Sequence, residues 1–543
     1  MSQKLLLATA AVATVAVSMH FALWTAHAQG NGRFPQDVQD VANALLRSEA
    51  AKYLSGSGEN ALKILGGGEA TAVAGIAATP SIEVSPFESS DAQVLVNDPA
   101  QDGPSAIAND ITSQSETAVA GIGNIVVVTF NDSSEFFTSN SFMGYSRSTN
   151  GGHTFTDLGR VPEGPIRGAA NLGDPGLVAN RAGQFYASAI AFDPDPLRAP
   201  GFSNTVSISK STNGGLTFGN PVFIPAGGVV PRGFQDKESI AVDNSRTATD
   251  GNVYVAWTSF PPAGAAPFTL PIFFSRSTNG GTSFSTPIRI SSSASINQGS
   301  TIAVGAAGEI YVAWLQFAPL SGIVVTKSTN GGVSFGAPVF ATPVNIIGFG
   351  SGNLFGNFRV NSFPNMDVNH TNGQTYITYA SMPNAFPAPN PDGSDVYFVR
   401  STNGGSAWSV PLRMNDDPSH DQFFPVLSVN RNGGIRAIWY DRRNDPNNLL
   451  IELFTTVSSD GGASFRPNIR VNVGSASFPA VGYDPETVLT YMGDYIDIKA
   501  ETTVDGRGTD FLLAWGDFKR IVTTPGGTRP DQDVYFTRRS GLE

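Results

Sequence analysis

The sequence predicts an all-β fold, a seven-bladed β-propeller, with a six-bladed propeller as the alternative. An eight-residue string of the form Ser-Thr-Asn-Gly-Gly-x-Thr/Ser-Phe recurs in six copies, two of them variants, that start 51 to 73 residues apart. Self-similarity with such a period is typical of propeller blades. The composition agrees, because 59 Gly, 36 Pro and 36 Phe in 543 residues are typical of a turn-rich β protein.

Each copy of the string follows two apolar stretches joined by a Gly turn, such as Ser239–Val242 and Val253–Trp257. One more pair of this kind follows the last copy, which brings the count to seven units. We expect four strands per unit, with the string turning the third strand into the fourth. The copies lie at Ser148–Phe155, Ser211–Phe218, Ser277–Phe284, Ser328–Phe335, Ser401–Trp408 and Ser458–Phe465. The units begin near Glu116, Asp174, Asp236, Gln298, Phe363, Asp421 and Asp494.

The last unit lacks a fourth strand of its own, because the chain stops soon after Asp533–Arg538. A strand without a unit, Gln93–Asp98, precedes the first unit and is similar to the fourth strands Pro411–Asp416 and Asn468–Asn472. We therefore expect residues 93–97 to complete the last blade, since closure removes the exposed edge of an open array. The propeller is predicted to span residues 91–543.

Residues 1–28 are predicted to be a signal peptide. Lys4 supplies a positive charge, Leu5 to Trp24 is largely apolar, and Ala26-His27-Ala28 has the small-x-small pattern of a cleavage site. We expect cleavage near Ala28 and a secreted or periplasmic protein of bacterial type, with no membrane attachment afterwards. An uncleaved anchor is the alternative, because about 20 apolar residues can span a bilayer.

Residues 29–90 are interpreted as a linker or pro-segment with a short helix. Between Gln36 and Leu54, four apolar residues recur at helical spacing, namely Val38, Val41, Leu45 and Leu46. The Gly- and Ala-rich stretch from Gly56 to Thr79 predicts flexible chain.

The composition excludes several classes of function. The absence of Cys removes disulfides, thiolate zinc sites and cysteine nucleophiles. A net charge of −12, from 45 acidic and 33 basic residues, argues against a nucleic-acid partner, which needs clustered Lys and Arg. No cofactor is predicted and no metal site is assigned. Calcium stays open because Asn390–Asp395 places oxygen ligands around a Gly turn, although a plain turn explains it as well.

The repeated string resembles the Asp-box of the sialidase superfamily, also called the bacterial neuraminidase repeat, with Asn in place of Asp in five of six copies. Trp439–Asp445 and Gly493-Asp494-Tyr495 are similar to segments of secreted sialidase-like proteins. The resemblance covers about residues 93–543. It implies a structural turn in each blade and a sialidase-like glycosidase that acts on an extracellular glycan or glycoprotein. Sialidases that resemble this chain have six blades, whereas the repeats here count seven.

Strand order predicts which face carries a site. Because the strands of a blade alternate in direction, the repeated turns lie on the face opposite to the start of each first strand. The long loops are expected on the latter face, where ligands bind most often. These loops are Asp193–Asn204, Phe260–Pro271, Val344–Val360, Pro383–Asp395 and Phe518–Gln532.

Candidate site residues lie at the same face. Paired carboxylates perform acid and base chemistry on glycosidic bonds, and arginine binds carboxylates through two hydrogen bonds. Each acid has a structural alternative, which is to cap backbone N–H groups between blades. Arg442 has the alternative of anchoring a loop together with Asp441. The catalytic candidates are Asp174, Asp236, Glu238, Asp421, Asp494 and Tyr440, and the substrate-binding candidates are Arg232, Arg359 and Arg442.

Two functions therefore stay open. The first is a glycoside hydrolase, which predicts a deep pocket with two carboxyl groups about 5–10 Å apart. The second is a non-catalytic propeller that binds or scaffolds a glycan or protein, which predicts an aromatic-rimmed face with salt-bridged acids. The sequence does not decide whether the protein is an enzyme.

Overall fold

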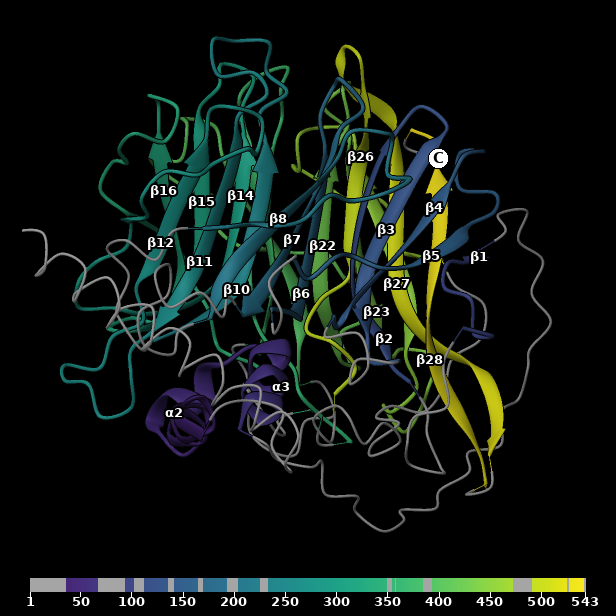
Figure 1. Cartoon of the computed structure of the whole chain (residues 1–543). Coiled ribbons are helices and arrows are strands. Elements are labelled where there is room, and N and C mark those ends of the chain that lie inside the picture. The colour runs from purple at the N-terminus through teal and green to yellow at the C-terminus, as the bar shows by residue number, and fades with distance from the viewer. Residues whose placement is uncertain are drawn as a thin grey trace, which may run out of the picture.

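The computed structural model describes residues 36–66, 93–101, 112–134, 141–164, 169–192, 204–224, 233–348, 354–356, 358–383, 393–471, 491–524 and 527–541. Within these ranges the chain is all-β apart from a helical segment near its start (Figure 1). Five four-stranded antiparallel sheets and one eight-stranded sheet account for the strands. The described helices include none long and apolar enough to cross a membrane. The signal-peptide prediction falls outside the described residues.

The strands follow the seven predicted units in chain order. Unit 1 holds β2 (Gln114–Ile122), β3 (Ile125–Asp132), β4 (Met143–Ser148) and β5 (Thr156–Arg160). Unit 2 holds β6 (Ala170–Ala179), β7 (Phe185–Phe192), β8 (Thr205–Ser211) and β9 (Val222–Phe223). Unit 3 holds β10 (Phe234–Val242), β11 (Val253–Phe260), β12 (Ile272–Ser277) and β13 (Ile288–Arg289). Unit 4 holds β14 (Ile296–Val304), β15 (Ile310–Ala318), β16 (Gly322–Ser328) and β17 (Val339–Pro343).

Units 5 to 7 continue the pattern. Unit 5 holds β18 (Asn365–Val368), β19 (Thr375–Ser381), β20 (Asp395–Ser401) and β21 (Leu412–Arg413). Unit 6 holds β22 (Gln422–Val429), β23 (Ile435–Asp441), β24 (Glu452–Ser458) and β25 (Ile469–Arg470). Unit 7 holds β26 (Asp497–Thr503), β27 (Gly506–Thr524) and β28 (Gly527–Arg539). β27 and β28 form one long hairpin, so the loop expected at Phe518–Gln532 is a pair of strands over most of its length.

The eight-stranded sheet joins the two ends of the chain. Its order is β1-β28-β27-β26-β2-β3-β4-β5, where β1 (Val94–Leu95) pairs antiparallel with β28. Val94 lies opposite Phe536, and the Asn97 side chain accepts a 2.9 Å bond from the Val534 N–H. Units 7 and 1 meet within this sheet through a single parallel pair between Ile122 and Thr502.

The first strands of the units contact one another in chain order. β2 contacts β6, β6 contacts β10, β10 contacts β14, β14 contacts β18, β18 contacts β22 and β22 contacts β26, while β26 returns to β2. These seven contacts form a closed cycle. Residues at or just before the first strands of all seven units line a narrow cavity of about 130 Å³, which we call the axial cavity.

A shared distortion shapes most of the first strands. β2, β6, β10, β14 and β22 each carry an irregular register near the middle, typical of a β-bulge. At that point each strand has a residue with positive φ, and in β6 the preceding Gly173 (φ 110°) has one too. Bulges of this kind re-aim side chains, and non-glycine residues with positive φ often mark functional sites. The residues are Glu116 (φ 50°), Asp174 (φ 57°), Lys237 (φ 51°), Gly299 (φ 69°) and Phe424 (φ 52°).

The repeated string forms the same turn in each copy. In the first copy the Ser148 hydroxyl accepts a 2.9 Å bond from the Gly152 N–H and donates to the Asn150 side chain. The Asn150 carbonyl oxygen then accepts the Thr154 N–H at 3.0 Å. Gly152 has a φ of 97°, a conformation that a side chain would strain. The polar side chains of the string therefore form hydrogen bonds within the turn itself.

Aromatic residues pack the units together. Four of the six Trp lie at one repeat position, inside the second strand, and all four are buried, as expected for packing residues. Each indole N–H has a partner, for example Gln235 for Trp257 at 2.8 Å. The four are Trp257, Trp314, Trp439 and Trp515.

The helical segment covers one end of the strands (Figure 1). It consists of α2 (Gln36–Leu46), the short 3-10 helix η1 (Glu49–Tyr53) and α3 (Gly56–Leu65). A helix was expected in the first part, but the prediction of flexible chain from Gly56 onward was wrong for α3. The Ser55 hydroxyl caps α3 by accepting the Gly58 N–H at 2.8 Å, and contacts with the sheets outweigh the low helix propensity of the two glycines.

Candidate functional site

The helix-covered ends of the first strands hold a group of buried polar side chains. Asp174 lies at the bulge of β6, and Asp236 lies just before the bulge of β10. Gln298 takes the same place in β14, while Arg359 and Asp494 precede β18 and β26. We call these five residues the acidic site. All five are buried. The sequence named four of them as candidates and gave Gln298 only as the start of a unit.

One serine hydroxyl lies between the two aspartates of the acidic site. Ser55 Oγ is 2.8 Å from Asp174 Oδ2 and 2.5 Å from Asp236 Oδ1. The Ser55 N–H also donates to Asp236 Oδ2 at 2.5 Å. The distance between Asp174 Oδ2 and Asp236 Oδ1 is therefore at most the sum of their two distances to Ser55 Oγ. This upper limit is compatible with the spacing of about 5–5.5 Å between the carboxyl groups of retaining glycosidases, and it is too short for the wider spacing of inverting ones.

Gln298 and Arg359 complete the polar wall. Gln298 Nε2 donates to Asp236 Oδ2 at 2.7 Å and to the Tyr53 carbonyl at 3.0 Å. Arg359 Nε donates to Asp494 Oδ1 at 2.9 Å, and its Nη2 donates to the Leu54 carbonyl. The acidic site thus presents two carboxylates, one amide and one guanidinium toward the same short stretch of backbone.

Burial sets the charge state of this group. Burial and the neighbouring Asp174 carboxylate raise the pKa of Asp236 to about 7, against the lowering effect of the two bonds from Ser55. Asp236 therefore exchanges its proton near neutral pH. A carboxyl group poised in this way is suited to general acid or base chemistry.

Glu238 lies two residues further along β10 and lines the axial cavity. Its side chain is buried, and within the described residues neither carboxylate oxygen has a hydrogen-bond partner. Burial and the Asp174 carboxylate raise the pKa of Glu238 well above its usual range. Glu238, next to the acidic site, is therefore a second carboxyl group that favours the protonated form.

Tyr495 and Glu116 adjoin the acidic site, although the sequence candidates did not include them. Glu116 accepts the Asp494 N–H at 3.0 Å, and the Tyr495 hydroxyl donates to the Pro175 carbonyl at 3.1 Å. Lys237 Nζ lies 3.5 Å from the centre of the Tyr495 ring. Burial and nearby carboxylates, Glu116 first, raise the pKa of Tyr495 well above its usual range. Two signals for them existed in the sequence: Tyr495 directly follows Asp494, and Glu116 opens unit 1.

Three other candidates lie apart from the acidic site, in unit 6. Arg442 Nη1 is 3.1 Å from Asp421 Oδ2, and both side chains are fully buried. Arg442 also packs over the Phe358 ring at 4.8 Å. The Tyr440 hydroxyl donates to the Gly516 carbonyl at 2.6 Å inside a hydrophobic cluster, where burial raises its pKa well above the usual range. The structure thus pairs Asp421 with Arg442 and directs Tyr440 into the core.

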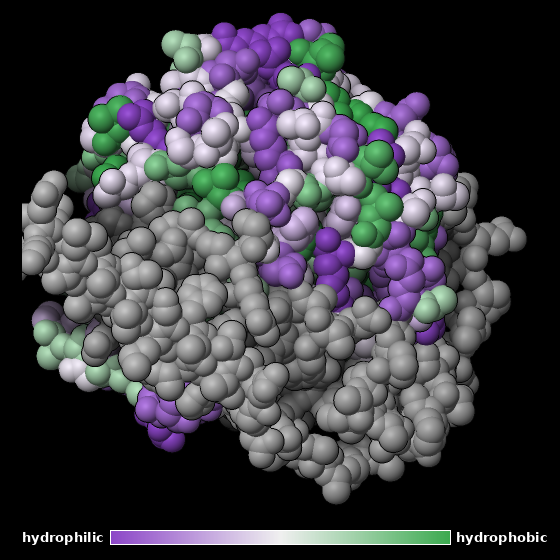
Figure 2. Space-filling view, in the orientation of Figure 1, coloured by the Kyte–Doolittle hydropathy of each residue, from purple (hydrophilic) through white to green (hydrophobic). Residues whose placement is uncertain are grey.

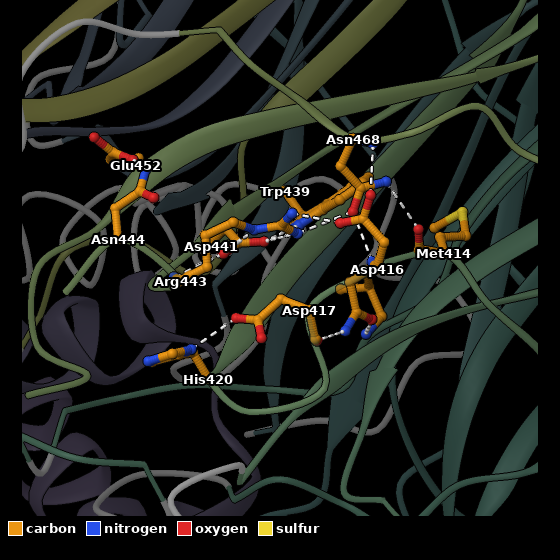
Figure 3. Close-up of polar contacts among 12 residues, drawn as sticks. Met414, Asp416, Asp417, His420, Trp439, Asp441, Arg443, Asn444, Glu452 and Asn468 are labelled. Carbon is orange, nitrogen blue, oxygen red and sulfur yellow. Dashed lines mark hydrogen bonds and ion pairs between the residues drawn. The ribbon is translucent and has the colours of Figure 1, made fainter. Parts of the chain in front are cut away.

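The polar residues next to them anchor a loop, as Figure 3 shows. Arg443 donates to Asp441 at 2.9 and 2.7 Å and to Asn468 at 2.9 Å. Asp441 also accepts the Trp439 indole N–H at 2.9 Å. His420 Nδ1 lies 2.7 Å from Asp417 Oδ2, below this network in the same view. In this network Arg443, rather than Arg442, is the arginine bonded to Asp441.

Two remaining predictions receive no structural account. Arg232 and the first half of the Asn390–Asp395 turn fall outside the described residues. Among the residues that are described, no group of three or more His, Asp or Glu side chains is placed to hold a metal ion.

The described surface in Figure 2 mixes hydrophilic and hydrophobic residues without one continuous apolar patch. The apolar residues at the helix-covered end of the strands are buried beneath the helical segment. At its edge the half-buried Phe268 and Phe317 receive the Tyr53 ring at centroid distances of 5.8 and 5.0 Å. The acidic site is therefore enclosed by an aromatic and aliphatic border.

Comparison with known proteins gives similarity of structure only. No protein-family model and no curated protein sequence matches the chain. A protein of unknown function from Dyadobacter fermentans is similar at TM-score 0.41 and 10% identity, over 83% of this chain and 99% of that one. The microbial sialidase Hz136 is similar at 0.40 and 12%, over 73% of each chain. A polysaccharide lyase of family PL25, an ulvan lyase, is similar at 0.45 and 11%, over 80% and 96%.

Proposed function

We propose that the chain is an exported, sialidase-like seven-bladed propeller whose acidic site binds an extracellular glycan and hydrolyses a glycosidic bond. The observation that carries the proposal is the pair Asp174 and Asp236, which hold one hydroxyl group between them. Export rests on the signal pattern between Lys4 and Ala28. The partner is a glycan or glycoprotein outside the cell.

The blade count draws its support from strand pairing. Four strands per unit, the pairing of Val94 with Phe536 and the cycle of contacts among the first strands all fit seven blades closed by an N-terminal strand. The repeated turns, in the role of Asp-boxes, would then lie on the face away from the acidic site. A six-bladed arrangement would leave one of these units without a place in the cycle.

Glycan recognition is supported by the chemistry of the acidic site. Sugars offer many hydroxyl groups, each of which can donate to a carboxylate and accept from an amide or a guanidinium. Asp174 and Asp236 supply acceptors, whereas Gln298 and Arg359 supply donors. Aromatic side chains at the border would cover the apolar faces of sugar rings. A phosphate-rich ligand fits poorly next to these carboxylates.

Hydrolysis is supported by the different environments of the carboxyl groups. A glycosidase needs one protonated carboxylic acid and one ionised carboxylate on the two sides of the bond that breaks. Asp236, whose pKa burial and Asp174 raise to about 7 with the segment 36–65 in place, is the candidate acid, and Asp174 is the candidate partner. Asp494 and Arg359, held as an ion pair at 2.9 Å, would then orient the ligand rather than transfer a proton.

A non-catalytic glycan-binding propeller is the alternative. Its specific support is that Arg359 and Asp494, like Arg442 and Asp421, are paired with each other inside the protein. Paired charges hold a shape well but transfer protons poorly. Binding without turnover would follow from the same contacts.

The test is a hydrolysis screen on aryl glycosides, the sialoside among them, with and without calcium. Residues 29–543 are assayed beside Asp236→Asn and Asp494→Asn, with Asp505→Asn as the matched control at an exposed site. The proposal predicts turnover that Asp236→Asn lowers by about 10²-fold or more, with normal melting. Turnover that is equal in all four proteins would contradict it. Binding without turnover in any of them would favour the alternative.

A further inference from the structure

The helical segment 36–65 is docked on the sheets as a core element would be. Its apolar residues join those of units 1 to 3 in one buried cluster, which lies at the border of the acidic site. From the segment come Val38, Ala42, Leu45, Ala50, Leu54, Ala61, Leu62 and Leu65. From the sheets and their connections come Phe142, Ala170, Leu172, Ile190, Phe192, Phe234, Phe260 and Leu270.

The polar contacts of the segment are concentrated on the acidic site. Four polar groups within residues 53–55 are used there: the carbonyls of Tyr53 and Leu54, and the N–H and hydroxyl of Ser55. Glu59 adds an ion pair to Arg359 at 3.4 Å. A hydroxyl held between two carboxylates, next to carbonyl oxygens held by an amide and a guanidinium, is the pattern that a polyhydroxylated ligand would present.

The fit between the segment and the acidic site is close. Gly58 lies in the first turn of α3 directly over Asp236, and a Cβ atom at this position would overlap the Asp236 carboxylate. Ala is a better helix former than Gly by about 1 kcal/mol. Replacing Gly58 by Ala therefore favours the helix itself while it blocks its docked position.

We propose that segment 36–65 is an intramolecular plug, which occupies the glycan site by presenting Ser55 in place of a sugar hydroxyl. The inference rests on the proposed function for the nature of the displaced ligand. While the plug is docked, Asp174, Asp236 and Arg359 are closed to any ligand from outside, so the turnover expected of residues 29–543 comes from the molecules in which the plug has moved. Displacement of the plug, or cleavage of the chain after Leu65 followed by its release, opens the acidic site and the aromatic border together.

The experiment measures access to the two aspartates directly. Residues 29–543 and their variants are treated near pH 6 with a water-soluble carbodiimide and glycine ethyl ester, which convert reachable carboxyl groups into amides. Mass spectrometry of peptides then gives the labelling of Asp174 and Asp236, and hydrogen exchange of the amides of η1 and α3 reports docking. Neither readout requires that the sugar be known.

Two variants displace the plug by different means. Gly58→Ala collides with Asp236, and Leu62→Asp places a carboxylate in the apolar cluster. Their matched controls are Gly219→Ala, where a Cβ meets only ordinary contact distance, and Gln36→Asp at an exposed position of α2. We expect each displacing variant to raise labelling of both aspartates at least tenfold and to speed exchange in α3, with neither change in the controls.

Two results would overturn the plug. One is faster exchange in α3 while Asp174 and Asp236 stay unlabelled, because the segment would then not be what closes the site. The other is wild-type labelling and exchange in both displacing variants. Failure of the proposed function looks different: both aspartates become reachable, yet no oligosaccharide protects them from labelling and no glycoside is cleaved.

Discussion

Phe155, in the first copy of the repeated string, packs edge-on against Phe536 in the last strand, with ring centroids 5.1 Å apart. The string of one unit thus rests on the third strand of the unit before it, and units 1 and 7 obey the same rule. The other examples are the pairs Phe218–Tyr145, Phe335–Phe274 and Phe465–Phe398. The repeated turns therefore hold neighbouring units together, and their aromatic residues are expected to matter for stability rather than activity.

Phe155→Ala should destabilise the protein by about 2 kcal/mol, since the ring is partly buried and loses an aromatic partner. Urea unfolding followed by tryptophan fluorescence gives the change in free energy. Leu216→Ala, at an exposed side chain in another copy of the string, is the control and should change little. If both substitutions change the free energy of unfolding by the same small amount, the contact between units 1 and 7 does not stabilise the protein.

Gly152→Ala should lower the free energy of unfolding by several kcal/mol, because a Cβ atom at this position would overlap the Phe536 ring. Gly123→Ala is the matched control: its φ of 59° is also positive, but nothing lies within 4 Å of its Cβ position. The control should lose only about 1 kcal/mol from backbone strain. If thermal melting drops equally in the two variants, the close approach of the turn to β28 is not real.

Asp236 should contribute stability that is lost as pH rises from about 4 toward 7. The pKa of Asp236 is raised from 3.8 in the unfolded chain to about 7 in the folded protein, so the folded state binds the extra proton between these values. The contribution of Asp236 to the free energy of unfolding therefore decreases with pH over this window. Asp236→Asn should remove part of that dependence in melting curves at pH 5 and pH 8. An unchanged difference between the two pH values would mean that Asp236 titrates normally.

Arg442→Met should destabilise the protein by about 3–5 kcal/mol, because it leaves the Asp421 carboxylate buried without its partner. The double variant Arg442→Met, Asp421→Asn should recover much of the loss. Chemical denaturation of the two variants and the wild type measures both effects. A single variant with normal stability but impaired ligand binding would instead return Arg442 to the role of a substrate-binding residue.

The sequence alone could predict the repeats, because a Gly-rich turn and two apolar strands recur with local signals that need no knowledge of the rest of the chain. It also named Asp174, Asp236, Arg359 and Asp494. What it could not supply was their partners. Arg359 meets Asp494 from 135 positions away, and Ser55 reaches Asp236 across 181 positions.

Two errors have physical causes. Composition indicated flexible chain after Gly56, but docking against units 2 and 3 stabilises α3 in a sequence with weak intrinsic preference for helix. The Gly- and Pro-containing stretch 518–532 was assigned to a loop, but it continues the hairpin of β27 and β28. In both segments tertiary contacts outweighed local preference.

The most direct test of the account is a glycan array probed with the Gly58→Ala protein, which we expect to have an open acidic site. We predict that the Gly58→Ala protein binds one class of glycans that the wild-type protein binds weakly. Adding Asp236→Asn should abolish this binding while the fold stays intact. If the Gly58→Ala protein binds no glycan, or binds the same glycans after Asp236→Asn, the acidic site is not a glycan site.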